Sequence, residues 1–205
     1  MSGSTDEVRA TLVGLGTATV AESGGRPLRP GLAPVGTGDV LAAPILPVLC
    51  PAGDNLAVHR AVAGAPRGVA LVVAIEGAPE RGWWGEVLTV AAQAGGIAGL
   101  VIDACVRDTL AISARGFPVW SRGVALPGTG KADPGQVGEP VQIRGCTASP
   151  GDWVVADADG VVIVAVADLD EVLVAGRERA QREARMFDEL VAGRTTVELL
   201  GLGPS

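Results

Sequence analysis

Buried strands alternate with short helices through the middle of the chain, and this alternation constrains the fold more than any other feature. Residues 69–75 and 99–103 are continuous apolar runs of the length expected for strands covered on both faces. Helix signals follow each run, at residues 85–94 and 107–114, and a third strand is expected at residues 117–120. Strands that alternate with helices favour an α/β fold with a parallel sheet.

Length and composition agree with one such domain. Hydrophobic residues make up 48% of the 205 residues, but only 3% of the chain is aromatic, so Ala, Val and Leu must supply most of the core. No internal repeat or second-domain linker is visible. We expect a single domain over residues 1–205, with a frayed end at residues 1–6.

The segments outside this core carry weaker signals. Residues 7–22 favour a short helix broken near a Gly-Leu-Gly segment, and residues 40–49 are apolar. Pro44 and Pro47 favour an edge or bulged strand there, because proline cannot donate to a ladder. The last charged, periodic stretch, residues 169–192, predicts the one long helix.

Short strands are expected before that helix, at residues 140–143, 152–156 and 161–166. The Asp-Ala-Asp-Gly segment at 157–160 favours a hairpin turn between the last two. It also resembles the start of a calcium loop, but the later ligands and the closing Glu are missing.

Charge and cysteine content argue against several classes of protein. The formal net charge of -7 and the absence of a Lys/Arg cluster argue against nucleic-acid binding. The three cysteines are far apart and lack zinc-ligand spacing, which indicates free thiols in a reducing compartment. There is no secretory signal and no apolar stretch of about 20 residues, so we expect a soluble cytoplasmic protein without a membrane partner.

The strongest chemical signal is a pair of helix starts. Gly85 and Glu86 open one helix, Arg107 and Asp108 open the next, and twenty residues separate Glu86 from Arg107. The helix, turn and strand between them would bring the second helix start back beside the first. Two helix N-termini, two carboxylates and a guanidinium suit a divalent metal and an anionic substrate.

Several of these residues also have a structural interpretation. Glu86 or Asp108 alone could be an acid in the first turn of a helix, where it favours the helix dipole. His59 is the only histidine and has no acid or nucleophile at motif spacing, which favours a structural role over a catalytic triad. Trp83 and Trp84 could fill the core or line a pocket.

Together these residues resemble the class II pyruvate aldolases typified by the 4-hydroxy-4-methyl-2-oxoglutarate/4-carboxy-4-hydroxy-2-oxoadipate (HMG/CHA) aldolases, which share a fold with the RNase E regulator RraA. The resemblance extends over about residues 12–200 and is densest in the segments Trp84-Gly-Glu-Val-Leu, Gly96-Ile-Ala-Gly-Leu-Val-Ile-Asp, Val106-Arg-Asp and Gly116-Phe-Pro-Val-Trp-Ser-Arg-Gly. Asp54-Asn-Leu-Ala-Val-His is similar as well. The resemblance implies an RraA-like three-layer ββα sandwich, a single α/β domain with a long C-terminal helix.

The family also implies a metal-dependent lyase that uses Mg²⁺ or Mn²⁺. By this resemblance Asp108 binds the metal directly and Glu86 acts through a metal-bound water. Arg107 would hold the pyruvyl end and its enolate oxygen, and the pyruvate carboxylate would bind at Gly85, Val87 and Leu88. An acid from the C-terminal helix of a neighbouring subunit would complete the outer shell, and Glu183 is the candidate.

The activity implied is retro-aldol cleavage of a 4-hydroxy-2-oxo di- or tricarboxylic acid, with release of pyruvate, by a homotrimer or a dimer of trimers. Oxaloacetate decarboxylation also forms pyruvate enolate, so the same metal and arginine would stabilise the negative charge in that reaction. One alternative is a non-catalytic RraA-like ring that binds and regulates an RNase or helicase. Another is an enzyme of the same fold recruited to a specialised pathway with a different acid substrate.

One departure from the family pattern bears on substrate choice. Ala104 and Cys105 stand where relatives usually carry Gly-Gly or Gly-Ala, which implies added bulk next to the pyruvyl site. Cys105 could also suggest a nucleophile, but no basic partner is near in sequence, and a small buried residue is favoured.

Overall fold

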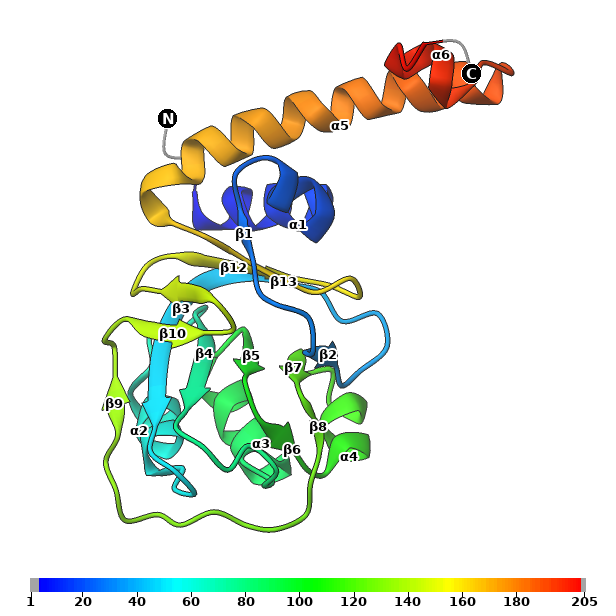
Figure 1. The fold of residues 1–205 in the computed structure, drawn as a ribbon. Coiled ribbons are helices and arrows are strands. Elements are labelled where there is room, and N and C mark those ends of the chain that lie inside the picture. Colours follow the sequence, from blue (N-terminus) through cyan, green and yellow to red (C-terminus); the bar gives the residue numbers. More distant parts are fainter. Residues whose placement is uncertain (1–3, 204–205) are drawn as a thin grey trace.

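The computed structural model describes residues 4–203 as a curled mixed sheet with helices on both faces (Figure 1). Ser4 caps the first helix, α1 (Thr5–Glu22), because its side chain accepts a hydrogen bond from the Glu7 amide. The prediction of a frayed end at residues 1–6 is therefore wrong for residues 4–6. Residues 1–3 lie outside the described part of the chain.

Parallel strands form the half of the sheet that carries the candidate site. In spatial order they are β3 (Leu41–Cys50), β4 (Ala70–Ile75), β5 (Gly99–Ile102) and β7 (Val119–Ser121). The helices that follow β3, β4 and β5 along the chain are α2 (Leu56–Gly64), α3 (Glu86–Gly95) and α4 (Thr109–Ala114). The predicted parallel α/β core is confirmed, with element ends within two residues of those expected.

β3 is a central strand, which corrects the expectation of an edge or bulged strand. Its first half pairs antiparallel with β12 (Trp153–Ala156), and its second half pairs parallel with β4. Pro44 stands at the end of the β12 ladder, one residue before the β4 ladder begins. Pro47 lies between the ends of β12 and β9 (Gln136–Val137), so neither ladder needs the N–H that a proline lacks.

The second half of the sheet curls over the first. β12 and β13 (Val161–Val164) form the predicted hairpin, closed by a 3.1 Å hydrogen bond from the Asp157 amide to the Gly160 carbonyl. β1 (Arg26–Pro27) extends this half, and β2 (Ala33–Pro34) pairs with β7 at the opposite edge. Two small pairs lie outside the main sheet: β10 (Val141–Ile143) with β11 (Cys146–Ala148), and β6 (Cys105–Val106) with β8 (Gly123–Val124).

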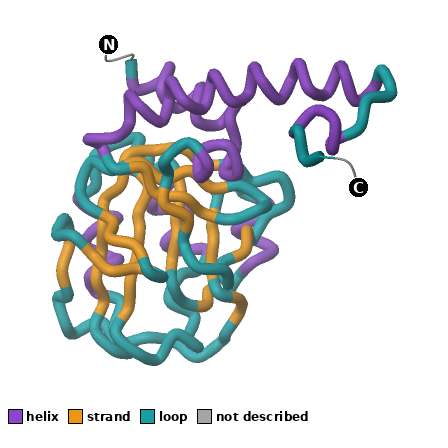
Figure 2. Tube along the Cα trace, turned by 45° about the horizontal axis from the view of Figure 1, so that its top comes forward, coloured by secondary structure: helices purple, strands orange, loops and turns teal. Residues whose placement is uncertain are grey.

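Figure 2 shows α1 and α5 together on one side of the strands. Apolar clusters hold the layers together. One packs α2 and α3 on the parallel half, and a second fills the space between the two halves. A third packs α1 and α5 (Leu169–Val191) on the outer face of β12 and β13. The two sheet halves and helices α2–α4 are the layers of the expected ββα sandwich, and α1 and α5 cover its far side.

α1 is tied to the hairpin turn by Asp157. The helix bends at Gly16, where φ is 74°, as the Gly-Leu-Gly segment predicted. The bend lets the amide and the hydroxyl of Thr17 donate to the two Asp157 carboxylate oxygens, at 2.8 and 2.6 Å. Burial would raise the pKa of Asp157, but these hydrogen bonds lower it below its ordinary value. Asp157 is therefore a structural residue, as the hairpin interpretation expected.

The C-terminal helix α5 is long, as predicted, but only its first half packs on the rest of the chain. Its buried residues are Val172, Leu173 and Gly176. Its second half extends past the body, with α6 (Thr196–Leu200), which was not expected, at its end (Figure 1). The short 3-10 turn η1 (Val166–Asp168) precedes it. In the described part of the chain, no helix has the length and apolar character needed to cross a membrane.

Candidate metal and oxo-acid site

A pocket of about 250 Å³ lies at the edge of the parallel sheet. Its walls come from the start of α2, residues 82–88, the Arg107–Asp108 pair and residues 128–131. These four segments follow the C-terminal ends of β3, β4, β5 and β7, the edge at which open α/β sheets bind ligands. The topology therefore brings the two predicted helix starts into one pocket.

Asp108 is held in a strained backbone conformation at the start of α4. Its φ of 58° and ψ of 35° are left-handed, which costs a residue other than glycine about 1 kcal/mol. Asp108 Oδ2 accepts a 3.0 Å hydrogen bond from the Glu86 amide, so the helix starts are joined as their spacing predicted. The side chain is 45% exposed, and no protein group in the described chain bonds to Oδ1, which leaves an oxygen for a ligand.

Two glycines allow this close approach. A Cβ at position 85 would lie 2.4 Å from Asp108 Oδ2. A Cβ at position 82 would lie 2.8 Å from Arg107 Cδ and 2.9 Å from the Ala125 carbonyl oxygen. Both contacts are too short for a side chain, so the pocket depends on glycine at both positions.

Arg107 is anchored by its backbone, and the one ion pair of its guanidinium within residues 4–203 is a long contact to Asp108. Its amide donates to the Trp84 carbonyl at 2.9 Å, while its Nε lies 3.9 Å from Asp108 Oδ2. The side chain is 45% exposed and lines the pocket, so the guanidinium can bind an anion there.

The N-terminus of α3 adds a second positive element. Gly85, Val87 and Leu88 all line the pocket, and the amides of the first helical turn have no acceptor within the helix. These N–H groups and the helix dipole favour a carboxylate. The structure thus groups the five predicted residues Gly85, Val87, Leu88, Arg107 and Asp108.

Glu86 is one of two predicted residues that lie outside the pocket wall; Glu183 is the other. The Glu86 backbone amide orders Asp108, but its carboxylate is not part of the pocket wall. Glu86 Oε1 instead accepts hydrogen bonds from Arg115 Nη2 at 2.7 Å and Nε at 3.1 Å. Arg115 follows α4, and nothing in the local sequence linked it to Glu86.

The donor set fits a hydrated hard cation. Among residues 4–203 no three His, Cys, Asp or Glu side chains come together as a metal cluster, and Asp108 is the one acid that lines the pocket. Mg²⁺ retains several waters and commonly binds through one or two carboxylates plus the substrate. A closed structural zinc site would need four protein ligands. The residues present are therefore compatible with Mg²⁺ or Mn²⁺ and not with a structural zinc.

Glu183 lies on α5, away from this pocket in its own chain. It pairs with Arg179 at 2.8 Å, one helical turn earlier. α5 packs on α1, and Figure 1 shows both at the opposite side of the molecule from α3 and α4. Its proposed role requires a neighbouring subunit and stays a prediction.

Several pocket residues were not predicted as site residues from the sequence, and Asn55, His59 and Lys131 are the chemically informative ones. Asn55 and His59 come from the start of α2, and Lys131 comes from the segment after β8. His59 lines the pocket, so it is placed to contact a ligand in addition to the structural role that the sequence favoured. Burial, and then the nearby Lys131, lowers the pKa of His59, which keeps the ring neutral at pH 7. The Asp54-Asn-Leu-Ala-Val-His similarity was the available signal.

Bulky residues close the floor of the pocket. Trp83 and Trp84 are fully buried and also line the pocket, so both interpretations of this pair hold. The Trp84 ring stacks on Phe117 with centroids 5.9 Å apart. Ala104 and Cys105, by contrast, are not pocket residues, which corrects the expectation of added bulk beside the pyruvyl site.

The cysteines are free thiols, as expected. Burial, and then the nearby Glu80 carboxylate, raises the pKa of Cys105 above its ordinary value. The half-buried Cys105 therefore lacks the thiolate character of a nucleophile.

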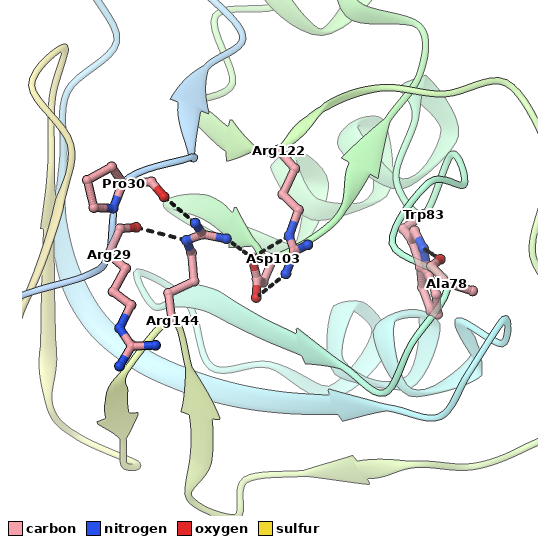
Figure 3. Close-up of polar contacts among 7 residues, drawn as sticks. All are labelled: Arg29, Pro30, Ala78, Trp83, Asp103, Arg122 and Arg144. Atoms are coloured by element: carbon pink, nitrogen blue, oxygen red, sulfur yellow. Dashed lines mark hydrogen bonds and ion pairs between the residues drawn. The ribbon is translucent and has the colours of Figure 1, made fainter.

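A network around Asp103 braces the C-terminal end of β5 (Figure 3). Arg122 donates to both Asp103 oxygens, at 2.6 and 2.8 Å, and Arg144 donates to Oδ1 at 2.9 Å. Arg144 also bonds the carbonyls of Arg29 and Pro30, so it fastens that loop to the sheet. Burial alone would raise the pKa of Asp103, but the two arginines lower it. Asp103, Arg122 and Arg144 do not line the pocket, so the network supports the pocket rather than extending it.

Comparisons with known proteins agree with this architecture. The family described as "RraA-like: Aldolase/RraA" matches residues 16–163. A protein of Halalkalibacterium halodurans named "Putative 4-hydroxy-4-methyl-2-oxoglutarate aldolase" is 33% identical over 169 residues, which is 80% of each chain.

Solved structures give the same result for the fold. A protein from Pseudomonas syringae is 27% identical and superposes with a TM-score of 0.82, over 95% of this chain and 92% of that one. Streptomyces coelicolor RraAS2, described as an unusual member of the RNase ES inhibitor RraA family, is 24% identical, with a TM-score of 0.75 over 95% of this chain and all of that one. Both the sequence match and the shared fold lead to one conclusion: this chain belongs to the RraA-like family.

Proposed function

We propose that this protein is a divalent-metal-dependent carbon–carbon lyase. It would cleave a 4-hydroxy-2-oxo di- or tricarboxylic acid by retro-aldol reaction, release pyruvate, and also decarboxylate oxaloacetate. The observation that carries the proposal is the convergence of Asp108, Arg107 and the α3 N-terminus on one pocket. The aldolase names of relatives that are 33–41% identical support the reaction class.

The chain's own groups suit the pyruvyl half of such a substrate. The substrate carboxylate would accept hydrogen bonds from the α3 amides at Val87 and Leu88, at the positive end of the helix dipole. The Arg107 guanidinium would face the 2-oxo oxygen, where negative charge develops as the carbon–carbon bond breaks. Because Arg107 and Asp108 are adjacent in the chain, one backbone segment determines the positions of both the guanidinium and the carboxylate.

The metal would be held by Asp108, with water completing its shell. Mg²⁺ or Mn²⁺ would supply a Lewis acid for the enolate oxygen. Glu86 would join the outer shell only by turning away from Arg115, because its Oε1 carries both bonds to that arginine. The C4 hydroxyl proton would leave to a water, since Asp108 is the only acid on the pocket wall and is committed to the metal.

We further propose assembly into a homotrimer or a dimer of trimers. The second half of α5 and the α6 segment leave apolar side chains exposed: Phe187 (59% exposed), Val191 (90%), Leu200 (55%) and Leu202 (68%). Burying such groups against another copy would be favourable and could deliver Glu183 to a neighbouring pocket.

The decisive experiment is pyruvate release from 4-hydroxy-4-methyl-2-oxoglutarate and from oxaloacetate, with Mg²⁺, with EDTA, and with the Asp108→Ala variant. The proposal predicts metal-dependent turnover that falls by about 10²–10³-fold or more in the variant. Mn²⁺ binding without turnover of either acid would support the recruited enzyme with another substrate. If the protein neither binds Mn²⁺ nor turns over either acid, the lyase proposal is overturned and the non-catalytic RraA-like ring is favoured.

A further inference from the structure

Resting on the proposed lyase, we infer that Lys131 binds the second carboxylate of the substrate and so selects 2-oxo acids that carry a distal carboxylate. Lys131 is the only lysine of the chain; the other 15 cationic side chains are arginines. It lines the same pocket as Arg107 but comes from the segment after β8. The subsite is thus built by a different part of the chain from the pyruvyl end.

The segment that carries Lys131 is fixed in place on one side by the start of α2. Asp54 Oδ2 accepts a 2.6 Å hydrogen bond from the Ala132 amide, next to Lys131. On the other flank, the Gly130 amide donates to the Gly53 carbonyl at 2.8 Å, and the Gly130 carbonyl accepts from the Asn55 amide at 3.1 Å. The backbone on both sides of Lys131 is therefore ordered by residues 53–55.

The same segment is also fixed from the side of α3. Arg81 Nη1 donates to the Gly128 carbonyl at 2.8 Å, and the Gly82 amide donates to the Pro127 carbonyl at 2.8 Å. These bonds join the Lys131 segment to the residues that lead into the pyruvyl end. The backbone that carries Lys131 is therefore held at the wall of the pocket that Arg107 also lines.

Charge in the pocket favours two anionic groups. Its charged lining residues are Arg107, Lys131 and the single acid Asp108, with His59 neutral. The nearby Asp54 carboxylate accepts hydrogen bonds from the amides of Ala132 and Leu56, and these bonds, with a smaller effect of Lys131, lower its pKa. No ion pair to Lys131 within 4.0 Å occurs among residues 4–203. A metal at Asp108 would offset that acid, and Arg107 serves the pyruvyl half, which leaves Lys131 as the cation for a distal carboxylate.

A hydrogen-bond acceptor is also available in the pocket wall. Asn55 is 4% exposed, and its Nδ2 donates to the Trp83 carbonyl at 2.9 Å, which fixes the amide orientation. Its buried Oδ1 has no partner, an arrangement that costs about 1–3 kcal/mol unless a ligand supplies a donor. The substrate 4-hydroxyl is such a donor. Lys131 would then bind the distal carboxylate and Asn55 the 4-hydroxyl, while Arg107 and the α3 amides hold the pyruvyl half.

The test compares substrates that share the pyruvyl half and differ in the distal carboxylate. For Lys131→Met, kcat/KM on 4-hydroxy-4-methyl-2-oxoglutarate should fall about tenfold or more, mainly through KM, because a charged hydrogen bond is lost. Turnover of 4-hydroxy-2-oxopentanoate, which lacks that carboxylate, and deuterium exchange of the pyruvate methyl group should stay within about twofold. Lys131→Arg should recover part of the loss. Arg60→Met, on the same α2 helix as His59 but outside the pocket, removes the same charge and should change neither substrate.

Several results would overturn the inference. Equal loss on both substrates, or an equal effect of Arg60→Met, would show that Lys131 contributes only general charge. An unchanged Lys131→Met enzyme would show that it contributes nothing to binding. Either result leaves the lyase itself intact, because wild-type turnover and pyruvate exchange are measured beside the variants. A wild-type protein inactive in both assays would instead refute the proposed function, and the distal subsite with it.

Discussion

Replacing Gly85 by alanine tests whether the position of Asp108 controls the metal site. The backbone at Gly85, with φ of -159° and ψ of -169°, is extended and accessible to alanine, so backbone strain does not enter. The added Cβ would meet Asp108 Oδ2 at 2.4 Å, whereas ordinary contact begins at 3.4 Å. The carboxylate must therefore move by about 1 Å, the difference between these distances.

That displacement breaks the 3.0 Å hydrogen bond from the Glu86 amide to Asp108. A hydrogen bond to a charged group contributes about 1.5–3 kcal/mol, and 1.4 kcal/mol corresponds to a factor of ten in affinity. We expect Gly85→Ala to weaken Mn²⁺ binding about tenfold or more, with a parallel loss of pyruvate release.

Isothermal titration with Mn²⁺ measures the affinity, and thermal unfolding shows whether the variant is folded. Gly14→Ala is the matched control, because a Cβ there meets nothing within 4 Å and the residue lies in α1, far along the chain from the site. It should leave Mn²⁺ binding unchanged and stabilise the helix slightly. Mn²⁺ affinity of a folded Gly85→Ala protein equal to that of the wild type would refute the assignment of Asp108 as the metal ligand.

Further predictions follow from the ion pairs and the histidine. Arg115→Met should tighten Mn²⁺ binding about two- to fivefold by releasing Glu86, since exposed ion pairs contribute at most about 1 kcal/mol; an equal gain in the Glu86→Gln background would show general electrostatics instead. Asp103→Asn should lower the free energy of unfolding by about 2–3 kcal/mol in urea titrations, because its two arginine partners are left facing each other; a midpoint equal to the wild type would contradict this. Because the pKa of His59 is lowered on folding, the unfolded chain takes up the proton first and stability falls as pH drops below about 6.5. His59→Gln should flatten the dependence of Tm on pH between about 6.5 and 5, and an unaltered slope would rule out this linkage.

The parallel core was predictable because its signals are local. The apolar runs at 69–75 and 99–103 have strand length, and glycines end the helices between them. The prediction that the two helix starts lie side by side followed from the same local order. Consecutive parallel strands place their C-terminal ends at one edge of the sheet.

What the sequence could not reveal depends on neighbours distant in the chain. Pro47 fits a central strand only because β12 stops before it and β9 starts after it. Glu86 leaves the pocket because Arg115 reaches it, and Lys131 enters the pocket because Asp54 holds the segment beside it. In these two contacts the partners are separated by 29 and by 78 positions in the chain, and no periodicity or spacing rule applies over such distances.

The bond between Thr17 and Asp157 has a consequence for synthesis of the chain. These residues are 140 positions apart, and α1 also buries Val8 and Leu12 against a cluster that includes Val172. After α1 has emerged from the ribosome, most of the remaining chain must still be synthesised before this helix can pack on its partners. During that interval its apolar face stays exposed, which is the state in which nascent chains are prone to aggregate and are held by chaperones. α1 is therefore synthesised long before the strands and the helix that cover it.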